Sequence, residues 1–221
     1  MLEVIVLAAG RGTRMRSSLP KVLHTLAGQP LINHVLDTAR SIDAEKLHVV
    51  IGHGAEQVSM AIAANDVTSY IQSEQLGTGH ATLAAAPHCQ TDSTVLVLFG
   101  DVPLLSVSTL ARVVAAAESG PVLLAASMDN PHGYGRVIRD GSGAFARVVE
   151  QKDASSDELL VREVNTGVLA AKSQDLNNWL SRVSNDNAQG EYYLPDVLGL
   201  AVHDGHSVEV VVTDDEIERK A

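Results

Sequence analysis

Apolar runs and amphipathic segments alternate along the first half of the chain. Continuous apolar stretches occupy residues 4–8, 47–51 and 94–99, and short runs of this kind predict buried strands. A shorter strand is expected at 70–72, and helices are expected at 30–41, 55–64, 79–86 and 106–119, the last capped by Ser106 or Ser108. Alternating strands and helices are typical of a mostly parallel sheet with helices on both faces.

The second half of the chain has a different pattern. Strand-like runs follow one another with turn residues and one short helical stretch between them, at 122–127, 135–139, 146–150 and 164–171. Helices are then expected at 173–182 and 194–202, and a last strand at 207–212. Together the two halves predict an α/β fold: a doubly wound, Rossmann-like, mostly parallel sheet with a small antiparallel excursion.

Composition narrows the class of partner. The 221 residues carry a formal net charge of −11, which argues against a general nucleic-acid surface and against binding to anionic membrane. There is one cysteine, Cys89, so no intramolecular disulfide can form. No apolar run reaches membrane-spanning length and the N-terminus lacks a secretory pattern, so we expect a cytoplasmic protein.

A glycine-rich stretch follows the first apolar run. Residues 7–15 read LAAGRGTRM, and residues 11–21 hold four basic side chains with no acid among them. Met15 stands where the dinucleotide fingerprint needs its third glycine, and the Gly-Lys-Ser/Thr of a P-loop is also absent. What remains is a turn whose backbone N–H groups can hold phosphate oxygens, with Arg14 as a two-pronged partner. The alternative is a solvated basic turn.

Two polar residues are expected on the same edge of the sheet as this turn, because ligands of such sheets bind at the carboxyl ends of the strands. Asp101 follows a buried strand, where a carboxylate needs a partner such as Mg²⁺. Gln72 offers an amide donor and acceptor that match the edge of uracil. On each residue alone, the alternatives are a helix cap for Asp101 and an exposed strand end for Gln72.

Several ordered stretches carry a resemblance to a known family. LAAGRGTRM with LPK at 19–21 is similar to the signature of nucleotidyltransferases that make nucleotide sugars, and QSEQLGTGHA at 72–81 resembles the base-recognition segment of uridylyltransferases. The further stretches are FGDVPL (99–104), GYGR (133–136), VVEQKDA (148–154), EVNTGV (163–168) and NDNAQGEYYLPDV (185–197). Together they resemble the uridylyltransferase half of bacterial bifunctional N-acetylglucosamine-1-phosphate uridylyltransferase/glucosamine-1-phosphate acetyltransferases, which have the nucleotide-diphospho-sugar transferase fold.

The resemblance implies a reaction and a role for each matching residue. The reaction is Mg²⁺-dependent formation of UDP-N-acetylglucosamine and pyrophosphate from UTP and N-acetylglucosamine-1-phosphate, for cell-wall precursor synthesis. It implies Arg14 and Lys21 as catalytic cations on the phosphates and Asp101 as the metal ligand. The substrate-binding residues that it implies are Leu7, Ala8, Gly10, Lys21, Gln72, Gly77, Thr78, Phe99, Gly100 and Asp101 for the nucleotide, with Gly135, Glu150 and Asn165 for the sugar. Phe99 stands where the family usually has tyrosine.

Taken singly, some of these residues have simpler explanations. Glu150 lies two positions before Lys152, and the two side chains can form a surface ion pair. Asn165 can satisfy backbone groups in a turn. The nine histidines lack metal-ligand spacing, so we do not expect a histidine-based metal site.

The end of the chain brings further expectations. The family has a second metal-ligating asparagine shortly after its last strand, and residues 213–221 contain none. We therefore expect residues 1–221 to be a uridylyltransferase domain truncated at its C-terminus, without the acetyltransferase β-helix or its activity. Because the family trimerises through that half, we expect a monomer. Two alternatives stay open: an inactive module that still binds sugar nucleotides, and a sister nucleotidyltransferase acting on another sugar-1-phosphate.

Overall fold

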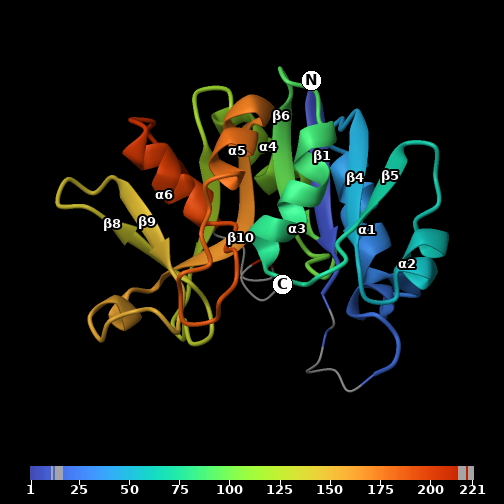
Figure 1. Cartoon of the computed structure of the whole chain (residues 1–221), viewed down its shortest axis with the longest axis horizontal. Helices are drawn as coiled ribbons and strands as arrows, with labels where there is room; N and C mark the ends of the chain where they lie inside the picture. Colours follow the sequence, from blue (N-terminus) through green and yellow to red (C-terminus); the bar gives the residue numbers. More distant parts are fainter. Residues whose placement is uncertain (11, 13–16, 214–217, 219–221) are drawn as a thin grey trace.

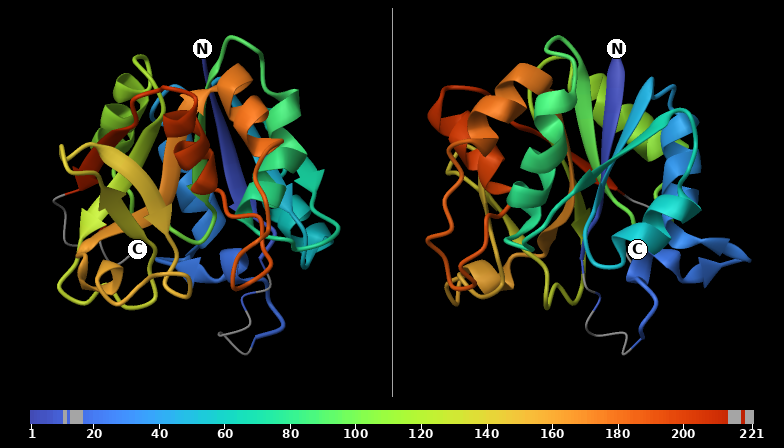
Figure 2. Two further views of the ribbon diagram at one scale, coloured as in Figure 1. Left: turned by 60° about the vertical axis from the view of Figure 1, so that its left-hand side comes forward. Right: turned by 45° about the vertical axis from the view of Figure 1, so that its right-hand side comes forward.

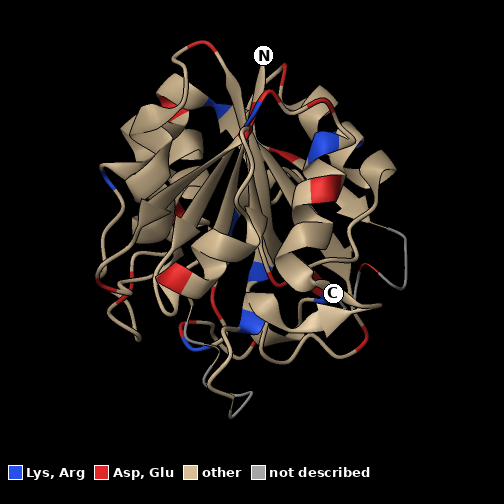
Figure 3. Cartoon of the chain, turned by 90° about the vertical axis from the view of Figure 1, so that its right-hand side faces the viewer, with Lys and Arg blue, Asp and Glu red and all other residues tan. Residues whose placement is uncertain are grey.

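The protein is built around a nine-stranded sheet with helices on both faces (Figure 1). The computed structural model describes residues 1–10, 12, 17–213 and 218. Charged positions lie chiefly on the helices and loops around the sheet (Figure 3). Among the described residues, no helix is both long and apolar enough to cross a membrane.

The main sheet has the strand order β11-β7-β10-β6-β1-β4-β5. Neighbouring strands run parallel except where β10 pairs antiparallel with both β6 and β7. The strands of this path are β1 (Leu2–Ala8), β4 (Lys46–Ile51), β5 (Val67–Ile71), β6 (Thr94–Phe99), β7 (Val122–Ser127), β10 (Glu163–Lys172) and β11 (Glu209–Thr213). The predicted doubly wound, mostly parallel sheet is confirmed.

The antiparallel excursion is a hairpin of β8 (Arg136–Arg139) and β9 (Phe145–Val149), which lies at one side of the molecule (Figures 1 and 2). It joins the main sheet where Val164 of β10 pairs with Arg136 of β8. A bulge interrupts the pairing of β10 with β7 between Asn165 and Leu169. The hairpin therefore leaves the sheet next to a break in regular pairing. A β-bulge bends its strand at such a point and ends the regular pairing there.

Alternate residues of β1 face two separate cores. Val4, Val6 and Ala8 pack into one core, and Ile5 and Leu7 into the other. Side chains of successive strand residues point to opposite faces, so a strand covered on both sides must be apolar throughout. The first core is closed by α1 (Leu31–Arg40), α2 (Ala55–Ala61) and α4 (Val107–Ala116), and the second by α3 (Thr78–Ala85), α5 (Ser173–Leu180) and α6 (Asp196–His203).

Several details of the first half differ from the sequence prediction: α2 ends at Ala61 rather than at residue 64, and α4 ends at Ala116 rather than at residue 119. β5 begins at Val67 rather than at residue 70, because Thr68 and Ser69 lie exposed on an edge strand and give no apolar run. A small hairpin of β2 (Thr25–Leu26) and β3 (Gln29–Pro30) was not predicted. Its turn has positive φ at both Ala27 (51°) and Gly28 (84°), the geometry of a tight hairpin, but alanine gives no sequence signal for it.

The structure also decides which residue caps α4. The Ser106 side chain accepts a hydrogen bond from the Thr109 backbone N–H at 3.1 Å, so Ser106 rather than Ser108 is the cap. Asp101 lies five positions earlier, and the helix-cap explanation for it is wrong. The described residues also include short 3₁₀ turns at η2 (Lys21–Leu23), η3 (Ala86–His88) and η4 (Glu158–Leu160).

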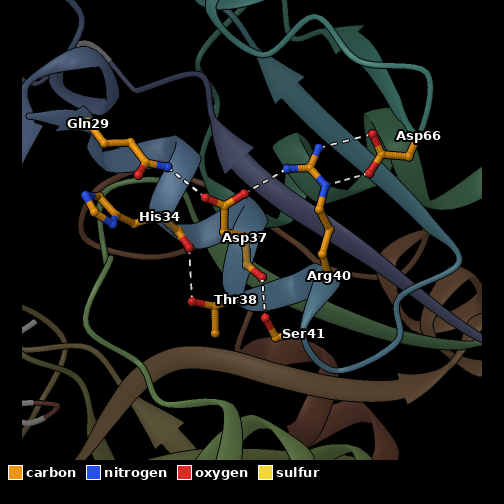
Figure 4. Close-up of polar contacts among 7 residues, drawn as sticks. All are labelled: Gln29, His34, Asp37, Thr38, Arg40, Ser41 and Asp66. Carbon is orange, nitrogen blue, oxygen red and sulfur yellow. Dashed lines mark hydrogen bonds and ion pairs between the residues drawn. The ribbon is translucent and has the colours of Figure 1, made fainter.

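An exposed ion pair ties the end of α1 to the segment that leads into β5. The guanidinium of Arg40 donates from Nε to Asp66 Oδ2 at 2.7 Å and from Nη2 to Asp66 Oδ1 at 3.1 Å (Figure 4). Its Nη1 donates to Asp37 Oδ1 at 3.0 Å. The two-pronged geometry is favourable, but exposed pairs of this kind contribute only about 0.2–1 kcal/mol.

Candidate functional site

A cavity of about 510 Å³ opens at the carboxyl edge of the parallel strands. Its walls come from the ends of β1 and β6, the segment after β5, the start of α3 and the 3₁₀ turn η2. The lining residues are Leu7, Ala8, Ala9, Gly10, Gly12, Lys21, Val22, Gln72, Gln75, Gly77, Thr78, Ala81, Phe99, Asp101 and Glu191. Gly10, Gln72 and Asp101 thus line one cavity, in agreement with their predicted placement on a shared rim.

Lys21 and Asp101 form an ion pair in this cavity. Lys21 Nζ lies 2.5 Å from Asp101 Oδ2, and the side chains are 42% and 25% exposed. A pair that retains this much solvent contact opens at little free-energy expense. Asp101 also keeps oxygen lone pairs that Lys21 does not use. A divalent cation such as Mg²⁺ is commonly held by one or two carboxylates together with substrate phosphates, so Asp101 suits that kind of metal.

The glycine turn sits directly against the lysine. Gly12 has φ +57°, and a Cβ added there would lie 2.9 Å from Lys21 Cβ. Glycine is thus required both by the backbone conformation and by the close approach of the lysine stem. Gly100 is held to the end of β1 by its backbone N–H, which donates to Leu7 O at 2.9 Å. Arg14 lies outside the described residues, as do Arg11 and Arg16.

Gln72 lies inside the protein rather than at an exposed strand end, so that alternative is wrong. The residue is 4% exposed, and its Nε2 donates to Gly77 O at 3.2 Å and to His80 Nδ1 at 2.9 Å. Both amide hydrogens are engaged within the protein. Gln72 therefore presents only an acceptor to a ligand, and the expectation that it offers a donor as well is wrong.

The segment after Gln72 is shaped by close backbone packing. Gly77 has φ +113°, and a Cβ there would come within 2.6 Å of Tyr192 O. Thr78, the first residue of α3, accepts from the Leu194 backbone N–H at 3.0 Å through Oγ1. The Thr78 hydroxyl thus joins α3 to the segment before α6, while the residue still lines the cavity.

The three residues expected at the sugar lie together beside β10. The Asn165 N–H donates to Gly135 O at 2.9 Å, and a Cβ on Gly135 would lie 2.9 Å from Glu150 Oε1. Phe99, which lines the cavity, lies against Gly167: an added Cβ there would come within 2.4 Å of the Phe99 ring. The Phe99 ring therefore links this cluster to the cavity.

The single-residue alternatives for Glu150 and Asn165 have different outcomes. Among the described residues, Lys152 Nζ donates to Gln189 Oε1 at 2.8 Å and forms no ion pair with Glu150. Burial raises the pKa of Glu150, as do the nearby Asp196 and Asp153 carboxylates. Asn165 Oδ1 does satisfy a backbone group, since it accepts from the Gly167 N–H at 2.8 Å.

A second cavity, of about 420 Å³, shares Glu150 with this cluster and is rich in acids. Burial, followed by the charge of Asp153, raises the pKa of Asp196 to about 6. Asp204 lies outside that lining and behaves in the opposite way: bonds from Arg182 and Trp179 hold its pKa at about 2.

The described residues contain one further cluster of possible metal ligands, Glu3, His48 and Cys89. His48 Nε2 lies 2.7 Å from Glu3 Oε2, and His48 Nδ1 lies 3.0 Å from the Tyr70 hydroxyl. Burial and the neighbouring Glu3 raise the pKa of Cys89 to about 12, so its thiol stays protonated and unreactive. These groups bond one another and are closed to solvent, which is the arrangement of a structural network.

Sequence reasoning missed His80 and Glu191 as parts of the site. His80 falls inside the 72–81 motif, but only the turn that starts α3 brings its ring back to Gln72. Glu191 reaches the cavity from a segment more than 100 residues downstream of that motif in the chain. Its place within the 185–197 stretch was the only available signal.

Comparison with known proteins decides the classification. Residues 4–163 match the model of the MobA-like NTP transferase domain. The chain belongs to this family. The match of this NTP transferase domain contains Lys21, Gln72, Asp101 and Glu150, whereas Asn165 lies just beyond it.

Curated relatives extend the similarity over nearly the whole chain. A bifunctional protein GlmU of Cellvibrio japonicus is 51% identical over 211 residues, which cover 95% of this chain and 47% of the relative. The proteins of the same name from Burkholderia orbicola and Saccharophagus degradans are 53% and 51% identical, covering 98% and 99% of this chain and 48% of each relative. The chain therefore spans about half the length of the curated relatives it matches.

Proposed function

We propose that this chain is a uridylyltransferase that makes UDP-N-acetylglucosamine and pyrophosphate from UTP and N-acetylglucosamine-1-phosphate, supplying cell-wall precursors. The observation that carries the proposal is the 510 Å³ cavity in which the glycine turn, the Lys21–Asp101 pair and Gln72 lie together. Membership of the NTP transferase family and the ordered motifs support it. The relatives are named bifunctional, and the proposal concerns one of their two functions.

The proposed reaction requires the protein to position charged groups rather than to transfer protons. A phosphate oxygen of the sugar phosphate attacks the α-phosphorus of UTP while pyrophosphate leaves on the opposite side. Since that oxygen is already anionic, no general base is required. Backbone N–H groups of the glycine turn hold phosphate oxygens, and Lys21, joined by Arg14, offsets the charge that builds up on the leaving group.

Asp101 is the proposed protein ligand for Mg²⁺. A bound Mg²⁺ would supply charge neutralisation at the phosphates. Lys21 lies 2.5 Å from the same carboxylate, so the lysine and the metal ligand are held next to each other before any substrate arrives.

The cluster beside β10 is the proposed sugar site. Gly135, Glu150 and Asn165 lie together there, and the absence of a side chain at Gly135 leaves room next to the Glu150 carboxylate. A carboxylate and an amide are suitable partners for sugar hydroxyl groups. Phe99 lies between this cluster and the nucleotide cavity, and it would pack against the junction of the two substrates.

We also propose that the domain works in the cytoplasm, as a monomer, on small anionic substrates. Its net charge of −11 disfavours nucleic acid and anionic membrane as partners. The basic residues of the 11–21 stretch are local in the sequence, and Lys21 lines the cavity, which favours a compact ligand such as a nucleoside triphosphate over a polymer. Light scattering of the purified chain would measure its assembly state.

The decisive test is pyrophosphate release from UTP, N-acetylglucosamine-1-phosphate and Mg²⁺, with GTP and glucose-1-phosphate as control substrates. Release that needs both UTP and the acetylated sugar, and that is lost in Asp101→Ala, would support the proposal. Release from a different pair would identify a sister enzyme. No release from any pair, together with UDP-N-acetylglucosamine binding by calorimetry, would identify an inactive binding module and overturn the proposal.

A further inference from the structure

The Gln72 carboxamide is held from two sides at the wall of the nucleotide cavity. Its Nε2 lies 3.2 Å from Gly77 O and 2.9 Å from His80 Nδ1. Backbone also holds the residue, because the Gln72 N–H donates to Ile51 O at 2.8 Å. The residue is 4% exposed, so its side chain has little room to adopt another orientation.

The contact with Gly77 decides which amide atom is which. A carbonyl oxygen can only accept, so the Gln72 atom beside Gly77 O must be the nitrogen. The same nitrogen faces His80 Nδ1 with its second hydrogen. His80 Nδ1 must therefore accept, and the neutral imidazole carries its proton on Nε2.

The remaining group of Gln72 is its carboxamide oxygen. No described residue donates a hydrogen bond to this oxygen, and Gln72 lines the cavity. A ligand in the cavity thus meets a fixed acceptor. Uracil carries an N–H at ring position 3, which can donate to such an oxygen. Cytosine carries a lone pair at the same ring position, and two lone pairs facing each other repel.

His80 is itself held in place. It lies in the first turn of α3, where Gly79 N–H donates to Tyr192 O at 2.7 Å and Leu194 N–H donates to Thr78 Oγ1 at 3.0 Å. The His80 and Tyr192 rings lie 6.3 Å apart between centroids. The packing that orders the start of α3 therefore also fixes the imidazole that Gln72 bonds.

We propose that His80 is a specificity-determining positioning residue. By accepting from Gln72 Nε2, it keeps the Gln72 oxygen turned toward the cavity, so that the site selects a pyrimidine with a ring N–H over one with a lone pair there. The inference rests on the proposed function, because it requires a nucleotide base at this wall. His80 acts through Gln72 and takes no part in the phosphate chemistry.

Matched variants at position 80 test the proposal. In His80→Leu the ring is replaced by a side chain of similar bulk without an acceptor, whereas in His80→Asn an amide oxygen stands close to the position of Nδ1. The measurements are kcat/KM for UTP and for CTP, with dissociation constants for both nucleotides by calorimetry. His80→Leu should lower the UTP preference about tenfold, and His80→Asn should keep it within about threefold, since one neutral hydrogen bond is at stake.

Two results would overturn the role of His80: an unchanged UTP preference in His80→Leu, or an equal loss of preference in both variants. If His80→Leu does not fold, His80→Ala removes the same acceptor with less demand on packing. The wild-type chain distinguishes a failure of the proposed function from a failure of the His80 role alone. If wild type binds UTP no better than CTP, the uridylyltransferase proposal fails and His80 loses its role with it. If wild type prefers UTP and the acceptor-less variant does too, only the inference fails.

Discussion

The two ends of the parallel strands hold acidic and basic side chains in opposite ways. At the carboxyl edge, Lys21 and Asp101 meet at 2.5 Å while remaining 42% and 25% exposed beside an open cavity. Near the start of β1, Glu3 and His48 meet at 2.7 Å but are 0% and 3% exposed. Their remaining polar atoms are also used, because the Gln90 N–H donates to Glu3 Oε1 and the Tyr70 hydroxyl bonds His48.

Contact distance therefore does not distinguish the Lys21–Asp101 pair at the cavity from the buried Glu3–His48 pair. Solvent contact and unused bonding capacity do. A buried carboxylate must be fully bonded or the fold loses stability, which explains the closed network around Glu3. A half-exposed carboxylate with free lone pairs can give up its partner for a ligand. We therefore expect substitution at the Lys21–Asp101 pair to change activity, and substitution at the Glu3–His48 pair to change the free energy of unfolding.

The largest effect is expected at the open pair. Lys21→Met should lower kcat/KM for pyrophosphate release by at least about a hundredfold, near 3 kcal/mol, because a cation is removed from the developing charge. The midpoint of urea unfolding should hardly move, since the pair is exposed. The exposed Lys46 supplies the matched control, Lys46→Met, which should leave the rate unchanged. Activity of Lys21→Met within threefold of wild type would contradict the assignment.

The next effect is expected at the closed network. Glu3→Leu removes both acceptor atoms and leaves the Gln90 N–H and His48 Nε2 without their partners inside the core, while His48 Nδ1 keeps the Tyr70 hydroxyl. We expect the free energy of unfolding by urea titration to fall by at least about 2 kcal/mol, the lower end for two buried unsatisfied groups at about 1–3 kcal/mol each.

Glu3→Gln is the control for that substitution. It keeps an acceptor for the Gln90 N–H and a polar partner for His48, so its loss of stability should be smaller. Activity per folded molecule should stay at the wild-type level in both variants. A Glu3→Leu protein as stable as wild type would show that the network is dispensable.

A third effect concerns carboxylates that lie between these two extremes. The raised pKa of Asp196, about 6, means that the folded protein binds a proton more tightly there than the unfolded chain does. The resulting penalty is fully present above pH 6 and fades as the pH falls to about 4. Asp196→Asn should therefore stabilise the fold by about 1 kcal/mol at pH 7.5, after allowance for partial exposure, and not at pH 4.

Asp204 supplies the comparison of opposite sign. Its pKa is lowered to about 2 by bonds to Arg182 and Trp179, so its contribution is present above about pH 4 and is lost as the pH falls toward 2. Asp204→Asn should destabilise the fold at pH 7.5. Urea midpoints of both variants at pH 4 and 7.5 provide the measurement. Shifts of the same sign at pH 7.5 would contradict this account.

The smallest effect is expected on the outer surface. Arg40→Ala breaks the two-pronged contact with Asp66 and should lower the free energy of unfolding by less than about 1 kcal/mol, because both groups keep much of their hydration. Urea titration in low and high salt measures it, and the difference from wild type should shrink in high salt. A loss as large as that of Glu3→Leu would mean that bond geometry, rather than burial, decides stability here.

Much of the fold could be predicted because its strands are short apolar runs separated by amphipathic helices. The rim of Gly10, Gln72 and Asp101 followed from the same pattern, since parallel strands bring their carboxyl ends together. The start of β5 was missed because an edge strand carries polar residues on its exposed side. Sequence periodicity reports burial, so it fails where burial is partial.

The sequence could not predict which side chains contact each other, for a different reason. The bond between Glu3 and His48 joins positions 45 residues apart, and Cys89, which gave no functional signal, is buried against the same glutamate. The role of His80 depends on the turn between β5 and α3, which sets whether its ring reaches Gln72. Local sequence identifies the residue types at such sites, but the three-dimensional path of the chain decides which of them touch.

The attachment of the β8–β9 hairpin also has a consequence for protein engineering and for divergence. The hairpin pairs with the main sheet at Val164 and Arg136, beside the bulge in β10. Gly135 directly precedes β8, and Glu150 directly follows β9. A hairpin that pairs with the main sheet at one residue pair can be lengthened, shortened or exchanged without a change in the strand order of that sheet. If the proposed sugar site is right, we expect sugar specificity to change by replacement of this hairpin, without alteration of the cavity at the ends of β1 and β6.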